Sequence, residues 1–238
     1  LTVMSKVILD NQGTLDKYIG DAIVAFYGAP APVENHEIKS CFTALKMQQA
    51  LDKLRLKWRN EDDWPDIVYS MQHRIGLNCG KMVTGNMGSE MRMNYTMMGD
   101  TVNLAARLES SAKQYGVYNF VGENIYEAAK SHFIFRFLDF VQVKGKKIPV
   151  KVYELVSDKK EVSTNDINLI KTFEEGLDYY FKKEWKSAII AFEKSESLED
   201  KFESRNTTPS NVYIERCTMF LNNPPDDDWD GVWAMTSK

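Results

Sequence analysis

The alternation of apolar and polar residues predicts short strands and long helices through the first two thirds of the chain. Apolar residues on one helical face predict a helix over residues 1–10, and two apolar runs around Gly20-Asp21 predict a β-hairpin over residues 14–26. Apolar residues at intervals of three and four then predict one long helix over residues 34–58 with a single buried stripe.

Glycines divide the middle of the chain into short elements. Alternation predicts a strand over residues 73–79 and the start of a second strand over residues 82–85. Gly85, Gly88 and the polar residues 89–92 then predict a loop, in which the glycines are either turn residues or a place where a phosphate approaches the backbone.

A strand-to-helix turn follows this loop. Residues 95–98 suit a strand, Gly99 ends it, and Asp100 is the expected N-cap of a helix that runs to about residue 112. Beyond it the pattern predicts a short helix over residues 123–129 and three strands, over residues 119–121, 133–143 and 150–155. The whole arrangement indicates an α+β sheet with helices on one face.

The last third of the chain has a different pattern. Residues 157–166 are polar and are predicted to form a linker before a helical segment over residues 167–238. Small and aromatic residues of this segment stand at tetratricopeptide spacing, namely Gly176, Tyr179, Trp185, Ala188 and Phe192. One repeat and a half is too few to be stable alone, so the segment must pack on the preceding domain, on a missing neighbour or on a protein partner.

Composition and charge say which partners, metal sites and cellular setting to expect. A net charge of −4 gives no electrostatic reason to expect nucleic acid or an anionic membrane as a partner. The three cysteines and three histidines are scattered, so neither a disulfide framework nor a zinc site is indicated, and a reducing, cytoplasmic setting is expected. No apolar run reaches the length of a membrane span, but the first residue, Leu1, suggests a piece of a longer protein, which leaves membrane anchoring of the parent open.

Polar residues at two turns are candidates for chemistry. Asn103 and Arg107 are four residues apart on one helical face, where an amide and a guanidinium suit a phosphorylated ligand. Asp21 lies at the predicted hairpin tip, with Lys17 four residues earlier. The alternative is an ordinary amphipathic helix and an ordinary turn, and these residues alone leave both interpretations open.

Taken together, these residues resemble a known family. Residues 15–21, Leu-Asp-Lys-Tyr-Ile-Gly-Asp, followed at the right interval by Tyr95-Thr96 and by Asn103 and Arg107, resemble the class III nucleotidyl cyclase catalytic domain. The resemblance implies a ferredoxin-like antiparallel sheet with helices over residues 1–156. The helical extension resembles the tetratricopeptide-like tail found after some bacterial adenylate cyclases.

The resemblance implies a role for each candidate residue. Lys17 and Thr96 would contact the purine, Asp21 would bind metal, and Asn103 and Arg107 would orient the ribose and stabilise charge at the α-phosphate. Lys144 or Lys146, at a lysine-rich turn that is otherwise ordinary solvated surface, would contact the terminal phosphates. A lysine donor and a hydroxyl acceptor suit adenine, whereas a guanine site would be expected to show a Glu and a small residue such as Cys.

The implied reaction is conversion of ATP to 3′,5′-cyclic AMP and pyrophosphate in signal transduction. In the family, two Mg²⁺ or Mn²⁺ ions assist the reaction, and each site lies between the two protomers of a homodimer. The family's other metal aspartate lies on a first strand of the form Phe-x-Asp-Ile, which would precede Leu1. We therefore expect a fragment of an active adenylate cyclase, with a catalytically silent nucleotide-binding regulatory module and a helical interaction scaffold as the alternatives.

Overall fold

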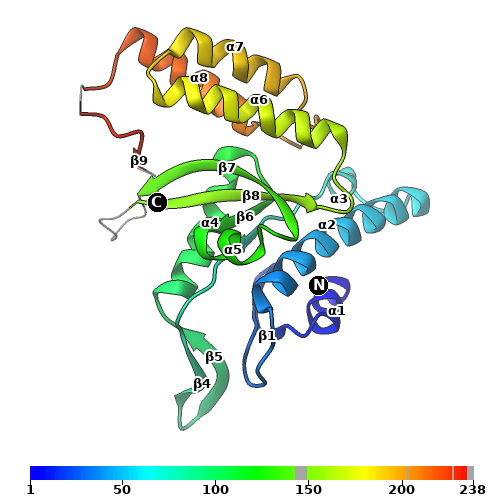
Figure 1. Cartoon of the computed structure of the whole chain (residues 1–238). Helices are drawn as coiled ribbons and strands as arrows, with labels where there is room; N and C mark the ends of the chain where they lie inside the picture. The colour runs from blue at the N-terminus through cyan, green and yellow to red at the C-terminus, as the bar shows by residue number, and fades with distance from the viewer. Residues whose placement is uncertain (143–148, 203, 227, 235–238) are drawn as a thin grey trace.

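The computed structural model describes residues 1–142, 149–202, 204–226 and 228–234. A five-stranded sheet lies at the centre, and the helical segment and a projecting β-hairpin lie at opposite ends of the molecule (Figure 1). The chain is thus an α+β protein with a C-terminal group of helices, as the sequence predicts.

The first hairpin forms where the sequence predicts it. Helix α1 (Thr2–Asp10) precedes strands β1 (Thr14–Ile19) and β2 (Ala22–Phe26), which pair with each other in a separate two-stranded sheet. Gly20 makes the turn with a positive φ of 61°, a conformation that glycine adopts without steric cost. Asp21 is therefore held at the hairpin tip.

Helix α2 (His36–Glu61) and the short α3 (Asp66–Tyr69) follow. The predicted stripe of α2 is confirmed where it meets the sheet, since Cys41, Ala44 and Leu51 are buried. The predicted strand over residues 73–79 is confirmed only as β3 (Ile75–Leu77).

A second separate hairpin corrects the prediction of a loop. Strands β4 (Val83–Ser89) and β5 (Arg92–Met98) form an unbroken antiparallel ladder, with the turn between Ser89 and Arg92. A Cβ atom at Gly88 would lie 2.0 Å from the carbonyl oxygen of Arg92. This glycine serves close strand pairing, which is why a glycine-rich stretch that suggested a loop forms a strand.

Helix α4 (Asp100–Tyr115) begins directly after β5. Its N-cap is Gly99, so the prediction that Asp100 is the cap is wrong by one residue. Asp100 lies in the first turn instead, where its charge complements the helix dipole. Gly116, with a φ of 64°, ends the helix in the left-handed conformation.

The central sheet combines strands from the middle and the end of the chain. Its order is β3-β6-β8-β7-β9, where the further elements are β6 (Asn119–Gly122), α5 (Glu123–Ala129), β7 (Phe133–Gln142), β8 (Val150–Asp158) and β9 (Trp233–Ala234). β6, β8 and β7 are antiparallel, whereas β3 and β9 add in parallel at the two edges.

Helices pack on both faces of this sheet, not on one face as the sequence pattern indicated. Neighbouring residues of β6 point to different cores: Phe120 belongs to a cluster with α4, and Val121 to a cluster with α2 and α5. Gly76 of β3 lets α4 approach closely, because a Cβ there would lie 2.3 Å from the carbonyl oxygen of Ala105. The position of α4 on the sheet is fixed by this contact.

The helical segment consists of α6 (Thr164–Phe181), α7 (Trp185–Glu196) and α8 (Pro209–Asn222). Two of the residues at tetratricopeptide spacing meet between α6 and α7, since a Cβ at Gly176 would lie 2.6 Å from the Phe192 ring. The predicted linker over 157–166 is shorter, because β8 extends to Asp158 and Ser163 caps α6. In the part of the chain that the structure describes, no helix combines the length and apolar character needed to cross a bilayer.

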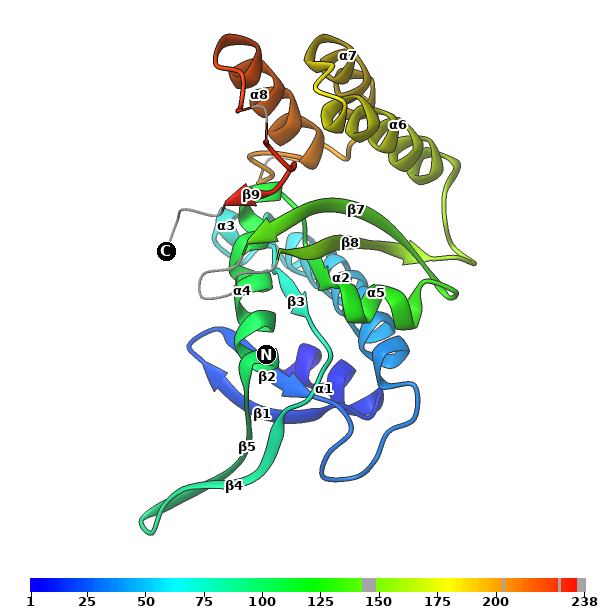
Figure 2. The same cartoon turned by 60° about the vertical axis from the view of Figure 1, so that its left-hand side comes forward.

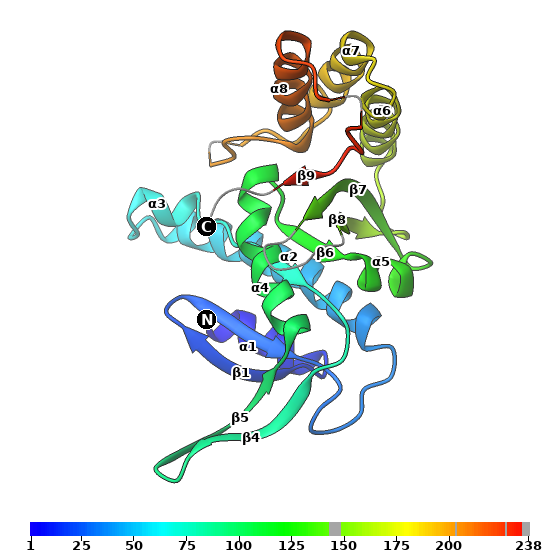
Figure 3. The ribbon, with the colours of Figure 1, turned by 90° about the vertical axis from the view of Figure 1, so that its left-hand side faces the viewer.

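The helical segment packs on the preceding domain, which was the first of the three predicted alternatives (Figure 3). Buried ion pairs join the two parts: Arg136 of β7 bonds Glu199 at 2.6 Å, and Arg216 of α8 bonds Asp139 of β7 at 2.6 Å. The Tyr213 hydroxyl also donates to the carbonyl of Leu138 at 2.6 Å. The tryptophans of the last stretch dock on this segment, with Trp229 against Tyr180, Trp185 and Phe220 and Trp233 against Arg216.

Candidate active site

The two hairpins meet at a cluster that contains both predicted purine-binding residues. The Thr96 hydroxyl of β5 donates a 2.6 Å hydrogen bond to Oδ2 of Asp16 in β1, and the same oxygen lies 3.5 Å from Nζ of Lys17. β1–β2 and the base of β4–β5 lie next to each other (Figure 2). Thr96 and Lys17, 79 positions apart in the printed sequence, are thus brought together through one carboxylate.

Asp16 is a residue that the sequence analysis missed. Neighbouring strand residues normally point to opposite faces, so a residue next to Lys17 would be expected to point away from it. The register of β1 against β2 shifts between Leu15 and Lys17, which makes Asp16 the extra residue of a β-bulge. The bulge lets the Asp16 and Lys17 side chains converge, and strict alternation cannot predict it.

The burial of this cluster is uneven. The side chain of Asp16 is 2% exposed and that of Lys17 is 44% exposed, so the lysine reaches solvent over a buried acid. Oδ1 of Asp16 is buried and has no hydrogen-bond partner among the described residues. A buried carboxylate oxygen without a partner can accept a donor from a ligand or from another chain.

Asn103 and Arg107 lie on the first two turns of α4, and both are exposed. The start of this helix is held from the side by the segment after β3. Asn78 donates from Nδ2 to the carbonyl of Thr101 at 3.0 Å, and the Thr101 hydroxyl donates to the carbonyl of Lys81 at 3.0 Å. The amide and guanidinium therefore project from a helix whose position is fixed by hydrogen bonds and by the Gly76 contact.

Asp21 is exposed at the β1–β2 turn. The hydrogen bond that joins the two hairpins runs through Thr96 and Asp16 rather than through Asp21. Lys144 and Lys146, the predicted phosphate-binding lysines, lie outside the described residues.

The donor at the predicted metal position fits a hard divalent cation. Mg²⁺ and Mn²⁺ prefer carboxylate oxygens, and Mg²⁺ completes its shell with water and substrate phosphates. The exposed carboxylate of Asp21 on a fixed turn suits such a ligand, whereas the Asp16 carboxylate already accepts from Thr96 and faces Lys17. One aspartate is fewer than the pair that the family resemblance implies.

Comparisons with known proteins identify the family of this chain. The sequence model of the adenylate and guanylate cyclase catalytic domain matches residues 3–157. An adenylate cyclase of Anabaena cylindrica is 34% identical over 161 residues, covering 65% of this chain and 30% of that protein. Adenylate cyclase 1 of Rhizobium meliloti is 29% identical over 164 residues, covering 69% of this chain and 24% of that protein.

Solved cyclase structures share the fold of this chain. The adenylyl cyclase CyaB from P. aeruginosa superposes with a TM-score of 0.59 at 28% identity, covering 68% of this chain and 81% of that one. The guanylyl cyclase Cya2 superposes with a TM-score of 0.56 at 29% identity, covering 68% of this chain and 79% of that one. Fold and sequence together define a nucleotide cyclase domain.

The chain belongs to the adenylate and guanylate cyclase catalytic domain family, and the resemblance found in the sequence is confirmed. It spans less than a third of the length of the two bacterial relatives, at 24% and 30%.

Proposed function

We propose that the chain is the catalytic part of an adenylate cyclase that converts ATP to cyclic AMP and pyrophosphate. The 3′-hydroxyl oxygen forms a bond to the α-phosphorus, the bond to the pyrophosphate oxygen breaks, and the hydroxyl proton passes to solvent. The observation that carries the proposal is the convergence of Lys17, Asp16 and Thr96 at the junction of the two hairpins.

The direction of the Thr96 hydrogen bond favours adenine. Because the hydroxyl donates its proton to Asp16, its lone pairs remain to accept from a ligand. Adenine presents an amine donor at its exocyclic position and an acceptor at N1, whereas guanine presents an oxygen and an N–H. Thr96 as acceptor and Lys17 as donor therefore match adenine at both positions and guanine at neither.

The remaining residues act on the sugar and the phosphates. The Asn103 amide orients the ribose, and the Arg107 guanidinium neutralises charge that develops on the α-phosphate, which a planar fork of donors does well. Asp21 holds divalent metal, which supplies neutralisation of the triphosphate and a lower pKa of the 3′-hydroxyl. Lys144 or Lys146 contacts the terminal phosphates.

A second copy of the chain completes each site in this proposal. The β4–β5 hairpin projects from the body and exposes large apolar side chains, with Val83 at 67%, Met91 at 94%, Met93 at 56% and Met98 at 60%. Exposed apolar groups on an extended arm favour association with another protein surface. A homodimer brings Asp21 of one protomer to Asn103 and Arg107 of its partner.

Activity is also proposed to need one further strand. β3 is the edge of the central sheet and pairs only with β6 among the described strands. In this proposal a further strand that pairs with this edge would bring the second metal aspartate. We therefore expect this chain alone to bind nucleotide and to turn it over poorly.

The test compares this chain with a longer one in which a strand of the form Phe-x-Asp-Ile is added before Leu1. Both are assayed at high protein concentration for cyclic AMP from ATP and cyclic GMP from GTP, with Mn²⁺ and with Mg²⁺. The longer chain is expected to form cyclic AMP, and Asp21→Asn is expected to lower its rate at least about a hundredfold. Absence of product from the longer chain, with ATP still bound, would favour the silent regulatory module.

Asp16→Asn tests the selectivity argument. An amide at residue 16 no longer fixes the direction of the Thr96 hydroxyl, so the preference for ATP over GTP in kcat/KM is expected to fall by about tenfold. Asp10→Asn, in an exposed pair with Lys6 on α1, is the matched control. An unchanged preference in Asp16→Asn would remove the basis of the adenine assignment.

A further inference from the structure

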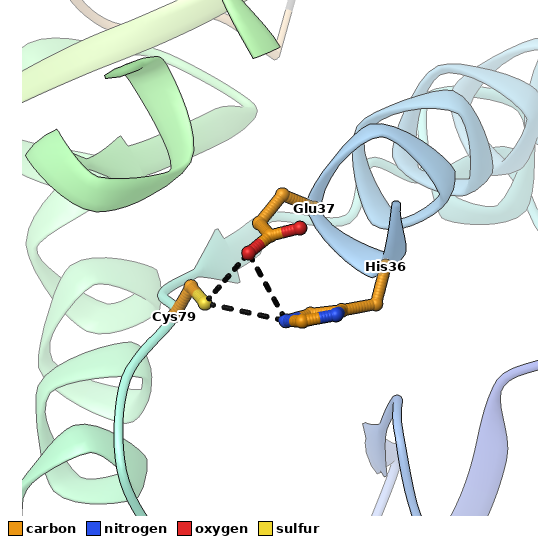
Figure 4. Close-up of side chains that lie close together, drawn as sticks. All are labelled: His36, Glu37 and Cys79. Atoms are coloured by element: carbon orange, nitrogen blue, oxygen red, sulfur yellow. Dashed lines mark hydrogen bonds and ion pairs between the residues drawn. The ribbon is translucent and has the colours of Figure 1, made fainter. Parts of the chain in front are cut away.

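A cluster of three metal-ligating side chains lies away from the candidate active site. His36 and Glu37 stand at the start of α2, and Cys79 follows β3, so that the side chains of two distant segments point at one another (Figure 4). Their ligand atoms lie within 4.8 Å of one another, the one such group found in the part of the chain that the structure describes. A separation of 43 positions between His36 and Cys79 conceals this cluster in the sequence.

The distances in this cluster match those of a tetrahedral zinc site. His36 Nε2 lies 3.1 Å from Glu37 Oε1 and 3.5 Å from Cys79 Sγ, and Sγ lies 3.3 Å from the same Oε1. Zinc bonds to nitrogen, sulfur and oxygen at tetrahedral angles place the ligand atoms about 3.3–3.6 Å apart. All three sides of the observed triangle lie close to this range, so only small side-chain movements are needed.

Charge and ligand type select the ion. A thiolate, a carboxylate and a neutral imidazole carry two negative charges, which balance a divalent cation. The partial positive charge at the N-terminus of α2 opposes any cation, and this pair of anions outweighs it. Thiolate and imidazole are ligands that Zn²⁺ prefers and Mg²⁺ does not, so this cluster differs chemically from the site at Asp21.

The surroundings hold the ligands in place and leave one position open. Asn124 donates from Nδ2 to the carbonyl of Cys79 at 2.8 Å, which fixes the backbone that carries the thiol. The side chains of His36 and Glu37 are 41% and 22% exposed, so solvent reaches the cluster. Burial and then Glu37 raise the pKa of the Cys79 thiol to about 11, so without metal the thiol keeps its proton and donates to that carboxylate.

We propose that His36, Glu37 and Cys79 form a zinc site whose fourth ligand is water. On binding, the thiol proton passes to solvent and a zinc–thiolate bond forms, while the imidazole and the carboxylate supply the other two protein bonds. The ion joins the start of α2 to the end of β3. Lys81 lies two residues after Cys79, and its carbonyl accepts from the Thr101 hydroxyl at the start of α4.

Cobalt absorption on the purified chain tests the site directly. Co²⁺ bound by a thiolate gives a sulfur-to-metal charge-transfer band, and tetrahedral coordination gives intense visible bands. The wild-type chain is expected to show both at one equivalent, and Zn²⁺ is expected to displace them. Cys79→Ala and Cys79→Ser are expected to lose the charge-transfer band, and His36→Ala to bind at least about tenfold more weakly.

The chain contains its own matched controls. It has three cysteines, so Cys41→Ala and Cys217→Ala must keep the band if Cys79 supplies the sulfur. His132→Ala is the control for the histidine, and Asp21→Asn must also keep the band if this site is separate from the proposed catalytic metal site. As a second readout, Zn²⁺ is expected to raise the Tm of the wild-type chain but not that of Cys79→Ser.

Two results would overturn the proposal. Absence of a thiolate band at stoichiometric Co²⁺ would make the cluster a hydrogen-bonded group only. A band that survives in both folded Cys79 variants, with folding checked by circular dichroism, would place the metal elsewhere. Neither result bears on cyclase activity, so the zinc site and the proposed function can fail independently.

Discussion

The two ends of helix α4 differ sharply in their surroundings. At its start, Asn103 and Arg107 are exposed on the surface. At its end, Tyr115 is 1% exposed, and its hydroxyl donates to Asp139 at 2.6 Å, the same carboxylate oxygen that Arg216 bonds at 2.6 Å. One helix therefore combines polar groups accessible to a ligand with polar groups fully satisfied inside the protein.

The same contrast separates the two sides of the domain. The side that faces the helical segment buries charge and pairs it: Glu199 accepts from Arg136, Arg205 and Ser210. Burial raises the pKa of Glu199, but the two arginines outweigh it and hold this pKa below its usual value. The opposite side, with the two hairpins, buries Asp16 but exposes Asp21 and the apolar side chains of β4–β5, and exposed groups are what binding sites require.

The largest expected effect is on the exposed end of α4. In the longer chain of the proposed assay, Arg107→Ala is expected to lower kcat/KM for ATP by about a thousandfold, because charge on the α-phosphate loses its proposed stabilising guanidinium. Asn103→Ala is expected to cost about a hundredfold, with the free energy of unfolding changed by less than about 0.5 kcal/mol. Lys113→Ala, at an exposed position of the same helix, is the control, and activity losses equal to that control would argue against the assigned roles.

Substitutions at the buried end of α4 should instead lower the stability of the fold. Arg216→Met leaves Asp139 buried without its cation, and we expect the free energy of unfolding to fall by about 3 kcal/mol in urea denaturation. Lys201→Met is the matched control, since Lys201 lies 4.0 Å from Glu196 with its side chain 70% exposed, and is expected to cost less than about 0.5 kcal/mol. The double variant Asp139→Asn/Arg216→Met should recover part of this loss. Equal losses of stability in Arg216→Met and in the control Lys201→Met would contradict a structural role for the buried pair.

The smallest effect concerns pH and another buried group. Burial and then Arg55 lower the pKa of His73 from 6.5 to about 4, against a smaller opposing effect of Asp52. Between these two pH values the folded chain holds fewer protons than the unfolded chain. The contribution of neutral His73 to the free energy of unfolding is therefore full above pH 6.5 and is lost as the pH falls towards 4. We expect a loss of about 2 kcal/mol over this window by urea unfolding.

His73→Asn should flatten this part of the pH profile. His132→Asn, at an exposed position, should leave the profile unchanged. If His73→Asn keeps the wild-type slope, another group is responsible for it.

Local signals in the sequence predicted the elements well. Gly20 and Asp21 marked the first hairpin, periodic apolar residues marked α2, and Gly176 with Phe192 marked the contact between α6 and α7. The errors have local causes too: Gly88 serves strand pairing and not a loop, and Gly99 replaces Asp100 as the cap.

Long-range convergence is what the sequence could not supply. Asp16 enters the site through a bulge that breaks alternation, and Cys79 meets His36 only after α2 and β3 have packed. Arg136 and Arg216 look like surface residues in sequence, and their burial depends on acids 63 and 77 positions away. Such contacts depend on tertiary packing, which no local pattern contains.

An unbroken α4 also has a geometric consequence. From Tyr115 to Asn103 the helix axis measures about 18 Å, so a tilt of about 5° about the buried end moves the amide by about 1.5 Å. A misplacement of that size is enough to slow an enzyme by about two orders of magnitude. A ligand or protein that displaces α8, and with it Arg216, is therefore expected to move Asn103 and, with it, the proposed reaction centre.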